Sequence, residues 1–224
     1  MQAKSAIRMT NIDLAYIRRV HNFEMERLGI THPAGIVFSP GENVFYVGVS
    51  PTAAQAAAPD TTLFRLTPTG ILSGTLHIAA PVDNPLNLTF DGKRNRLLIF
   101  NLAENQLLEV ATDVNGALNP NTLKHYNVQS FGLQNPQGMT VDPASGYLFI
   151  LDATGPRLLR VEPGADGSFD NALTTSIDLQ TVGMVNPHGL AWDSSSNHLH
   201  ILSTGEQRLY ELSLNGQVVT TRNM

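Results

Sequence analysis

The sequence contains no cysteine, so it can form neither disulfide bonds nor thiolate zinc sites. Lysine occurs only at Lys4, Lys93 and Lys124, and the formal net charge of the 224 residues is −5. No basic stripe with interleaved aromatic residues is present, which argues against a nucleic-acid partner. No apolar run approaches the ~20 residues that cross a bilayer, so we expect no membrane insertion.

Recognisable targeting and catalytic signals are missing as well. The first 25 residues lack the apolar core of a signal peptide, and no nucleophile elbow, zincin helix motif or phosphate-binding loop is present. The absence of cysteine does not decide the compartment, because both cytosolic and secreted bacterial proteins can lack it. Our expectation is a soluble bacterial protein, secreted or at the cell surface, with no signal peptide in this chain.

What the chain does contain is a phrase repeated four times. The copies are His32-Pro33-Ala34-Gly35, Asn84-Pro85-Leu86-Asn87, Asn135-Pro136-Gln137-Gly138 and Asn186-Pro187-His188-Gly189. Successive prolines are 52, 51 and 51 residues apart. A period near fifty residues with turn residues at fixed places is typical of radial or solenoid repeats.

Each repeat contains three short runs of aliphatic, branched and aromatic residues that predict strands. The runs are 35–38, 44–47 and 63–66; 88–90, 97–100 and 107–110; 138–141, 148–151 and 158–161; and 189–192, 199–202 and 209–212. A hairpin turn follows at Gly70, Gly116, Gly167 or Gly216, and weaker fourth strands are predicted at 75–79, 124–128 and 174–179. Four antiparallel strands per period indicate an all-β protein, a β-propeller of about four blades. A β-sandwich does not require its hairpins to repeat in sequence.

The sequence predicts one more fourth strand than four complete blades need. Residues 16–23 predict one more fourth strand, placed before the first repeat as 174–179 is before the last, and residues 218–223 predict another. We therefore expect one propeller domain or fragment over 1–224, with blades starting near 33, 85, 136 and 187 and an outer strand and lead-in at 1–31. The ring is expected to be incomplete, with a closed four-blade ring as the alternative. An open ring exposes blade faces and a sheet edge, which favours self-association.

The last repeat resembles an NHL repeat. It runs Asn-Pro-His-Gly-Leu-Ala-Trp-Asp over 186–193, and then His-Leu-His-Ile-Leu-Ser over 198–203. Residues 135–161 match equally well, including Asp152 and Arg157, whereas the first two copies carry Ser39 and Asn87 at motif positions of Asp and Gly. The resemblance covers 31–214 and extends to gluconolactonase-like propellers.

This resemblance implies rings of about six blades and a fold used for ligand binding, protein docking, lactone hydrolysis and lyase chemistry. Gluconolactonase-like relatives use inward Glu, Asn and Asp side chains around a divalent ion. The aligned inner positions here are Ala34, Leu86, Gln137 and His188, which do not reproduce that set.

Candidate binding residues follow from the connectivity of a four-stranded meander. Loops that enter the first strand and loops that leave the second strand emerge at the same rim, and rim loops usually carry binding residues. Gln137 and His188 lie on the entering loops, and Asn101 and Asp152 end second strands. These four are the candidate ligand-binding residues. The alternatives are that Asp152 caps its turn or pairs with Arg157, and that His188 has no partner.

Other features have structural explanations. His198 and His200 are two apart on one strand, a spacing that can chelate a metal but that also occurs on ordinary strands. Asp91, Asp142 and Asp193 are expected to hydrogen-bond the turn after the first strand, at the opposite rim. The segments 113–116 and 166–170 resemble parts of calcium-binding loops but lack the full set of oxygen ligands. We therefore expect them to be ordinary hydrogen-bonded turns. Residues 51–60 lengthen one candidate-rim loop, either as a ligand lid or partner contact or as an unconstrained loop.

These observations favour a non-enzymatic propeller that binds a protein or carbohydrate ligand through rim loops. No catalytic residue, metal ligand or cofactor is assigned, although a divalent metal such as calcium stays open. The alternative is a metal-dependent hydrolase or lactonase, or a lyase, with its site at the central channel near His188 and Asp152.

Overall fold

The computed structural model describes residues 24–49, 60–80 and 87–224. Within these ranges the strands form four sheets, each of four antiparallel strands in simple sequential order. Blade 1 contains β1 (Pro33–Ser39), β2 (Val44–Val49), β3 (Thr61–Leu66) and β4 (Leu72–Ile78), and blade 2 contains β5 (Asn87–Asp91), β6 (Arg96–Asn101), β7 (Gln106–Ala111) and β8 (Lys124–Asn127). Blade 3 contains β9 (Pro136–Val141), β10 (Leu148–Asp152), β11 (Arg157–Glu162) and β12 (Leu173–Asp178), and blade 4 contains β13 (Pro187–Asp193), β14 (His198–Ser203), β15 (Arg208–Leu212) and β16 (Val218–Asn223).

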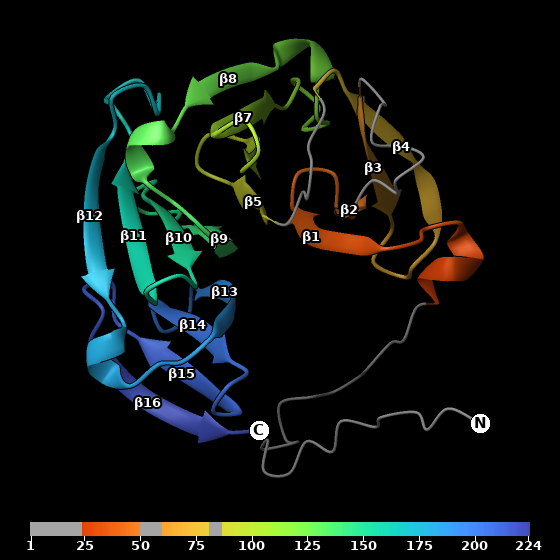
Figure 1. The fold of residues 1–224 in the computed structure, drawn as a ribbon. Helices are drawn as coiled ribbons and strands as arrows, with labels where there is room; N and C mark the ends of the chain where they lie inside the picture. Colours follow the sequence, from red (N-terminus) through yellow and green to blue (C-terminus); the bar gives the residue numbers. More distant parts are fainter. Residues whose placement is uncertain (1–23, 50–59, 81–86) are drawn as a thin grey trace, which may run out of the picture.

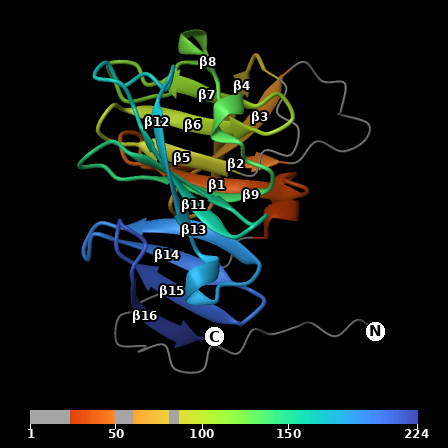
Figure 2. The same cartoon turned by 60° about the vertical axis from the view of Figure 1, so that its left-hand side comes forward.

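The four sheets fan around a common centre, as a β-propeller does (Figure 1). The first strand of each sheet lies innermost and the fourth lies outermost, and the turned view in Figure 2 shows the inner strands next to one another. The prediction of an all-β propeller with four blades of four antiparallel strands is therefore confirmed. The predicted strands at 16–23 and most of the 51–60 loop lie outside the described residues, whereas the predicted strand at 218–223 is β16.

The predicted hairpin glycines do adopt left-handed backbone conformations. Their φ angles lie between 80° and 84° at Gly70, Gly116, Gly167 and Gly216. In blade 1 the Gly70 N–H donates to Thr67 O at 2.8 Å while the Thr67 N–H donates to Ile71 O at 2.9 Å. A turn closed in this way needs one residue with positive φ, and glycine adopts that conformation without a Cβ clash.

The helical content of the described residues consists of short 3₁₀ turns in the connections. These are η1 (Met25–Leu28), η2 (Pro120–Thr122), η3 (Gln129–Phe131) and η4 (Gln180–Val182). Among the described residues, none of these helices has the length and apolar character to cross a membrane.

Most of the hydrophobic core lies at the boundaries between blades, and a small cluster around Ile30, Val47 and Leu66 packs η1 against blade 1. One cluster joins blades 1 and 2, a second joins blades 2 and 3 and includes Phe100 and Ile150, and a third joins blades 3 and 4 and includes Phe149 and Ile201. Because alternate residues of a strand point to opposite faces, the neighbours Phe149 and Ile150 belong to different clusters. Each internal blade therefore buries both of its faces.

The described blades form an open arc. The inner strands pack in sequence, β1 on β5, β5 on β9 and β9 on β13, and no packing of comparable extent joins β13 to β1 among the described strands. Figure 1 shows the corresponding opening between blade 4 and blade 1. On the outward face of blade 1, Ile36 is 57% exposed and Phe38 is 40% exposed. Self-association through this face stays a prediction, which sedimentation velocity at increasing protein concentration would test.

Candidate functional site

Two of the four candidate residues meet across a blade boundary. Gln137 lies at the start of β9 and His188 at the start of β13, so both belong to the rim that carries the repeated proline phrases, here called the Pro-x-Gly rim. The His188 Nδ1 atom is 2.8 Å from Gln137 Oε1, and both side chains are half-buried. Adjacent copies of the repeat thus place their variable residues in direct contact.

The hydrogen bonds fix the polarity of this pair. Gln137 Nε2 donates to Asn135 Oδ1 at 2.6 Å, which leaves Gln137 Oε1 as an acceptor facing the imidazole. In a neutral imidazole one nitrogen donates and the other accepts, so a neutral His188 ring that donates to Gln137 Oε1 carries its proton on Nδ1. Its Nε2 atom is then the acceptor that remains for a ligand hydroxyl or N–H group.

Asp152 has the structural role that is the alternative to ligand binding. The side chain is fully buried. It accepts the backbone N–H groups of Gln134 at 3.1 Å, Asn135 at 2.9 Å and Thr154 at 3.1 Å, and Arg157 Nη2 donates to it at 3.1 Å. Its carboxylate therefore ties the loop before β9 to the end of β10, and the pairing with Arg157 is confirmed.

The equivalent positions in the neighbouring blades are also buried. Asn101 ends β6 and is 1% exposed, and Ser203 ends β14 and donates to the backbone oxygen of Val185 in the preceding loop. Whether Asn101 and Asp152 contribute to ligand binding is untested. Their burial means that they support the Pro-x-Gly rim from beneath, while Gln137 and His188 lie closer to solvent.

A groove between blades 3 and 4 lies on the same rim, and one of its lining residues, Asn186, is two positions before His188. It has a volume of about 460 Å³ and is lined by the loop after β10, including Pro156, and by the connection from η4 to β13, including Gln180 and Asn186. Gln180 and Asn186 supply polar groups, while Pro156, Met184 and Val185 supply apolar surface. The groove extends the candidate surface from the inner strands along the boundary between blades 3 and 4.

Turn chemistry accounts for the acids on the opposite rim, as predicted. Asp91 Oδ1 accepts the backbone N–H groups of Lys93 and Arg94 at 3.1 and 3.2 Å, and Asp142 Oδ1 accepts that of Ala144 at 2.8 Å. At Asp193, hydrogen bonds from the Ser195 hydroxyl, the Ser195 backbone N–H and the Ser196 hydroxyl lower the pKa to about 2.

The two segments that echo calcium loops are also hydrogen-bonded turns. Asp113 Oδ1 accepts the N–H groups of Asn115 and Ala117 at 2.8 and 3.0 Å, and Asp166 Oδ1 accepts that of Ser168 at 2.9 Å. Among the described residues, no three His, Asp or Glu side chains gather closely enough to hold a metal ion. Binding of a divalent ion such as calcium stays open to experiment.

His198 and His200 engage separate carboxylates on blade 4. His198 Nδ1 is 2.7 Å from Glu211 Oε1, and His200 Nε2 is 3.7 Å from Asp193 Oδ2. The shared strand face therefore supports two cross-strand pairs.

A buried ionic network that the sequence did not reveal joins blades 2 and 3. Arg96 is 4% exposed, and it donates from Nε to Asp91 Oδ2 at 3.0 Å and from Nη1 to Glu109 and to Gly167 O. Tyr126 and Lys124 also donate to Glu109, at 2.8 and 3.0 Å. The only sequence signal was a pair of charged residues, Arg96 and Glu109, within otherwise apolar strands.

Burial and these partners act in opposite directions on Glu109. Burial by itself raises the pKa of the Glu109 carboxyl, but the hydrogen bond from Tyr126 and the charges of Arg96 and Lys124 outweigh it, so the pKa lies below its ordinary value of 4.5. Burial and the hydrogen bond to Glu109 raise the pKa of Tyr126. Both groups are held in the ionisation state that suits an Arg–Glu–Tyr network.

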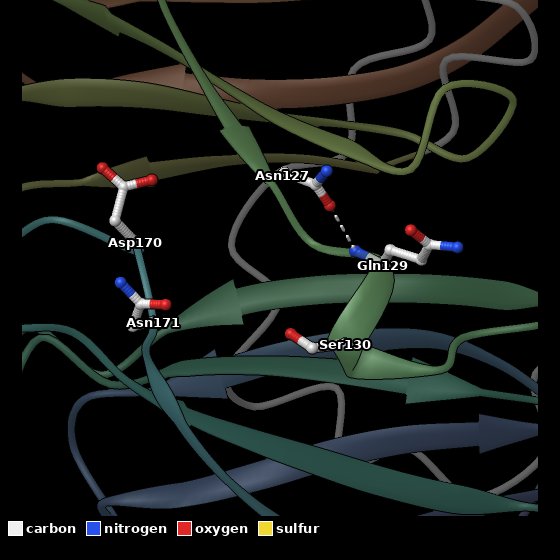
Figure 3. Close-up of a pocket in the computed structure, with 5 residues that line it drawn as sticks. All are labelled: Asn127, Gln129, Ser130, Asp170 and Asn171. Carbon is white, nitrogen blue, oxygen red and sulfur yellow. Dashed lines mark hydrogen bonds between the residues drawn. The ribbon is translucent and has the colours of Figure 1, made fainter.

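A second surface hollow lies at the periphery of blades 2 and 3 (Figure 3). It has a volume of about 750 Å³ and is lined by Asn127, Gln129 and Ser130 from the end of β8 and η3, and by Asp170 and Asn171 before β12. In Figure 3 the two groups of residues lie on opposite sides of the hollow, and Asn127 Oδ1 accepts the Gln129 backbone N–H at 3.0 Å. All five residues are exposed, and the lining carries no cationic side chain.

The fold defines this chain as a β-propeller protein. The sequence matches no protein-family model and no curated protein. Several solved structures are similar to it. A chain of a nidogen/laminin complex has a TM-score of 0.61 and 16% identity, over 86% of this chain and 65% of that chain.

Several of the similar structures are named as enzymes. The periplasmic gluconolactonase PpgL of Pseudomonas aeruginosa has a TM-score of 0.58 and 11% identity, over 86% of this chain and 57% of that chain. A catalytically inactive virginiamycin B lyase from Staphylococcus aureus, with quinupristin, has a TM-score of 0.53 and 15% identity, over 85% of this chain and 55% of that chain. This chain thus spans less than two thirds of each similar structure. At these identities the likeness shows the fold alone, because one fold hosts many functions.

Proposed function

We propose that this propeller is a non-enzymatic binding module that holds a protein or carbohydrate ligand on its Pro-x-Gly rim. The observation that carries the proposal is the chain of hydrogen bonds from Asn135 through Gln137 to His188, which leaves His188 Nε2 as an acceptor at the rim. Loops on a rigid scaffold are the usual place for binding residues. An imidazole oriented by neutral amides suits the recognition of a hydroxyl or N–H group.

The neighbouring groove supports the same reading. It combines apolar surface from Pro156 and Met184 with polar groups from Gln180 and Asn186. Binding sites commonly combine an apolar lining with a few polar groups that set orientation. A segment of a glycan or an extended peptide fits this mixture better than a highly charged ligand does, because no lysine or arginine lines the groove.

Arrays of printed glycans and of printed peptides test the proposal directly. We expect the wild-type chain to bind a defined set of features, and His188→Ala and Gln137→Ala to weaken that binding at least about tenfold, which corresponds to about 1.4 kcal/mol. The matched control is His125→Ala. His125 lies on β8 and pairs with Gln106 Oε1 at 2.9 Å, which repeats the His–Gln pair on the outer strands of blade 2 rather than on the inner strands. Equal losses in both histidine variants, or no bound feature for the wild type, would contradict the proposal.

The alternative function is a metal-dependent hydrolase or lactonase, or a lyase, that uses the same rim. Its support is the enzymatic activity of similar folds together with the acceptor nitrogen of His188. A thermal-shift scan with calcium, zinc and manganese separates the two functions, because an ion that binds the folded state raises the melting temperature. A metal-dependent shift together with gluconolactone turnover that His188→Ala abolishes would favour the enzyme.

Within the propellers, we propose the NHL-repeat type for this chain. The support is the Pro-x-Gly phrase together with Asp152 and Arg157, which occupy positions of the NHL motif. Asp152 pairs with Arg157 and accepts the Asn135 backbone N–H, so this pair also holds the loop before β9. A solved structure that contains complete flanking blades with the same pairs would test the assignment.

A further inference from the structure

The rim opposite the proposed ligand surface contains a cavity between blades 2 and 3. Its volume is about 360 Å³, at the lower end of the range for small-ligand pockets. Three cations line it, Arg94, Arg96 and Lys124, together with the acids Glu109 and Asp166. Tyr126, Gly167 and Ser168 complete the lining. The function proposed above does not use any of these groups.

Most acceptors of this cluster are already engaged by other donors. Glu109 accepts Lys124 on Oε1 and both Arg96 and Tyr126 on Oε2. Asp166 Oδ1 accepts the Ser168 backbone N–H at 2.9 Å. Asp91 contacts Arg94 and Arg96 but does not line the cavity. It accepts two backbone N–H groups on Oδ1 and Arg96 Nε on Oδ2.

The donors are in excess. Arg96 Nη2 and Arg94 Nη1 are both buried without a hydrogen-bond partner, and the whole Arg96 side chain is 96% buried. Arg94 Nη1 has Asp91 Oδ2 at 3.5 Å, an ion-pair distance outside hydrogen-bond geometry. Buried donors in native proteins nearly always have an acceptor, from protein, water or a bound ion. Arg96 Nη2 and Arg94 Nη1 therefore lack an acceptor among the described residues.

Two glycines of blade 3, Gly146 and Gly167, leave room for the Arg94 guanidinium because they have no β-carbon. A β-carbon on Gly146 would lie 2.1 Å from Arg94 Nη1, and one on Gly167 would lie 2.3 Å from Arg94 Nε. Two turns of blade 3 thus hold Arg94 of blade 2 beside the cavity. Arg94 is 24% exposed and Lys124 is 62% exposed, so a ligand from solvent would enter past these two side chains.

We propose that this cavity binds a small oxyanion, a phosphate or carboxylate group, through Arg94, Arg96 and Lys124. Charge-assisted hydrogen bonds from guanidinium groups are the usual means of holding such groups. The three cations are matched by Asp91, Glu109 and Asp166, and a fourth acid, Asp170, contacts the lining residue Ser168 at 3.2 Å. The attraction therefore comes from the unused N–H groups rather than from net charge. The anion would supply the acceptor that the protein groups do not.

Thermal shifts with inorganic phosphate and with glucuronate, each against sodium chloride of equal ionic strength, test the site. At a ligand concentration tenfold above the dissociation constant, we expect the wild-type melting temperature to rise by about 3 °C. The variants Arg94→Gln and Lys124→Gln should lose most of this rise. The matched control is Lys93→Gln, because Lys93 Nζ donates to Ala144 O at 2.6 Å and does not line the cavity. Arg96→Gln is avoided because it would leave Asp91 and Glu109 buried without their main cation.

The two ligands distinguish a tetrahedral anion from a carboxylate. A rise with either one that Arg94→Gln and Lys124→Gln reduce and Lys93→Gln preserves supports the site. A rise of equal size in all four proteins means an adventitious ion only and overturns the proposal, as does no rise with either ligand. Nuclear magnetic resonance provides a second measurement, since a saturable shift of the Arg96 Nε–H signal with phosphate is expected. Absence of that shift in a protein that is stabilised by phosphate would place the anion elsewhere.

Discussion

Leu190 approaches Gly138 so closely that a β-carbon on Gly138 would lie 2.6 Å from the Leu190 backbone nitrogen and 2.7 Å from the Leu190 β-carbon. Gly138 is on β9 and Leu190 is on β13, the inner strands of blades 3 and 4. The glycine of the Pro-x-Gly phrase is therefore required here by packing between blades, since its φ is not positive. At the next copy, Gly189 has open space around its β-carbon position but a φ of +72°.

Replacing Gly138 by alanine should separate the two inner strands. We expect Gly138→Ala to lower the free energy of unfolding by about 1–3 kcal/mol, the usual cost of an overpacked contact, measured by urea denaturation. Gly92→Ala is the control, because nothing lies within 4 Å of its β-carbon position and its φ is unexceptional. A change at Gly138 no larger than that at Gly92 would mean that the strands can move apart freely.

The sequence predicted the blades well because the features that define them are local. A turn glycine such as Gly116 and a strand such as 148–151 depend on neighbouring residues and on alternation, which a single repeat already contains. The Asp152–Arg157 pair was also foreseeable, since the two residues face each other across one hairpin. Because the same turn and strand pattern occurs in four repeats, it predicts the blades more strongly than one copy would.

Contacts between blades could not be read from the sequence in the same way. The Gln137–His188 pair joins residues 51 positions apart, and the Arg96 contact with Gly167 joins residues 71 positions apart. Both depend on the distance and angle at which whole sheets pack, which no local pattern encodes. For the same reason, the candidate set combined buried supports such as Asp152 with rim residues such as His188.

Removing the Asp152 carboxylate should destabilise the fold strongly. Asp152→Ala leaves three backbone N–H groups and Arg157 without their acceptor, and we expect a loss of about 3–5 kcal/mol. Ser203→Ala, at the equivalent position of blade 4, removes one hydrogen bond to Val185 and should cost about 1 kcal/mol. Urea denaturation of both variants measures the difference. Similar losses at the two positions would show that Asp152 is not the main anchor of its loop.

Glu109 should make the stability depend on pH in the acid range. Its pKa in the folded protein is below 4.5, so its contribution is fully present above about pH 5 and is lost as the pH falls through the folded-state pKa. We expect Glu109→Gln to lose about 3 kcal/mol at pH 7, and the difference from the wild type to shrink at pH 3. Denaturation at the two pH values measures this change.

The control for this pH dependence is Glu162→Gln. Glu162 pairs with Arg160 at 2.9 Å, but both side chains are 29% exposed, and such pairs contribute little. Its effect should stay within about 0.5 kcal/mol at both pH values. A Glu109 variant whose deficit is the same at pH 3 and pH 7 would show that packing, rather than the charge of Glu109, accounts for its stabilising effect.

The orientation of the Gln137 amide should be visible in the tautomer of His188. At a pH where the ring is neutral, long-range proton–nitrogen spectra of nitrogen-15-labelled histidine should show the proton of His188 on Nδ1, because Gln137 presents Oε1 to it. Gln137→Ala should remove this preference and move the ring toward a mixture of tautomers. His125 is the internal comparison. It also faces a glutamine oxygen, but no second hydrogen bond orients Gln106 among the described residues, so its preference should be weaker. A His188 ring with its proton on Nε2 would reverse the donor and acceptor roles at the Pro-x-Gly rim, and the ligand group bound there would then have to be an acceptor.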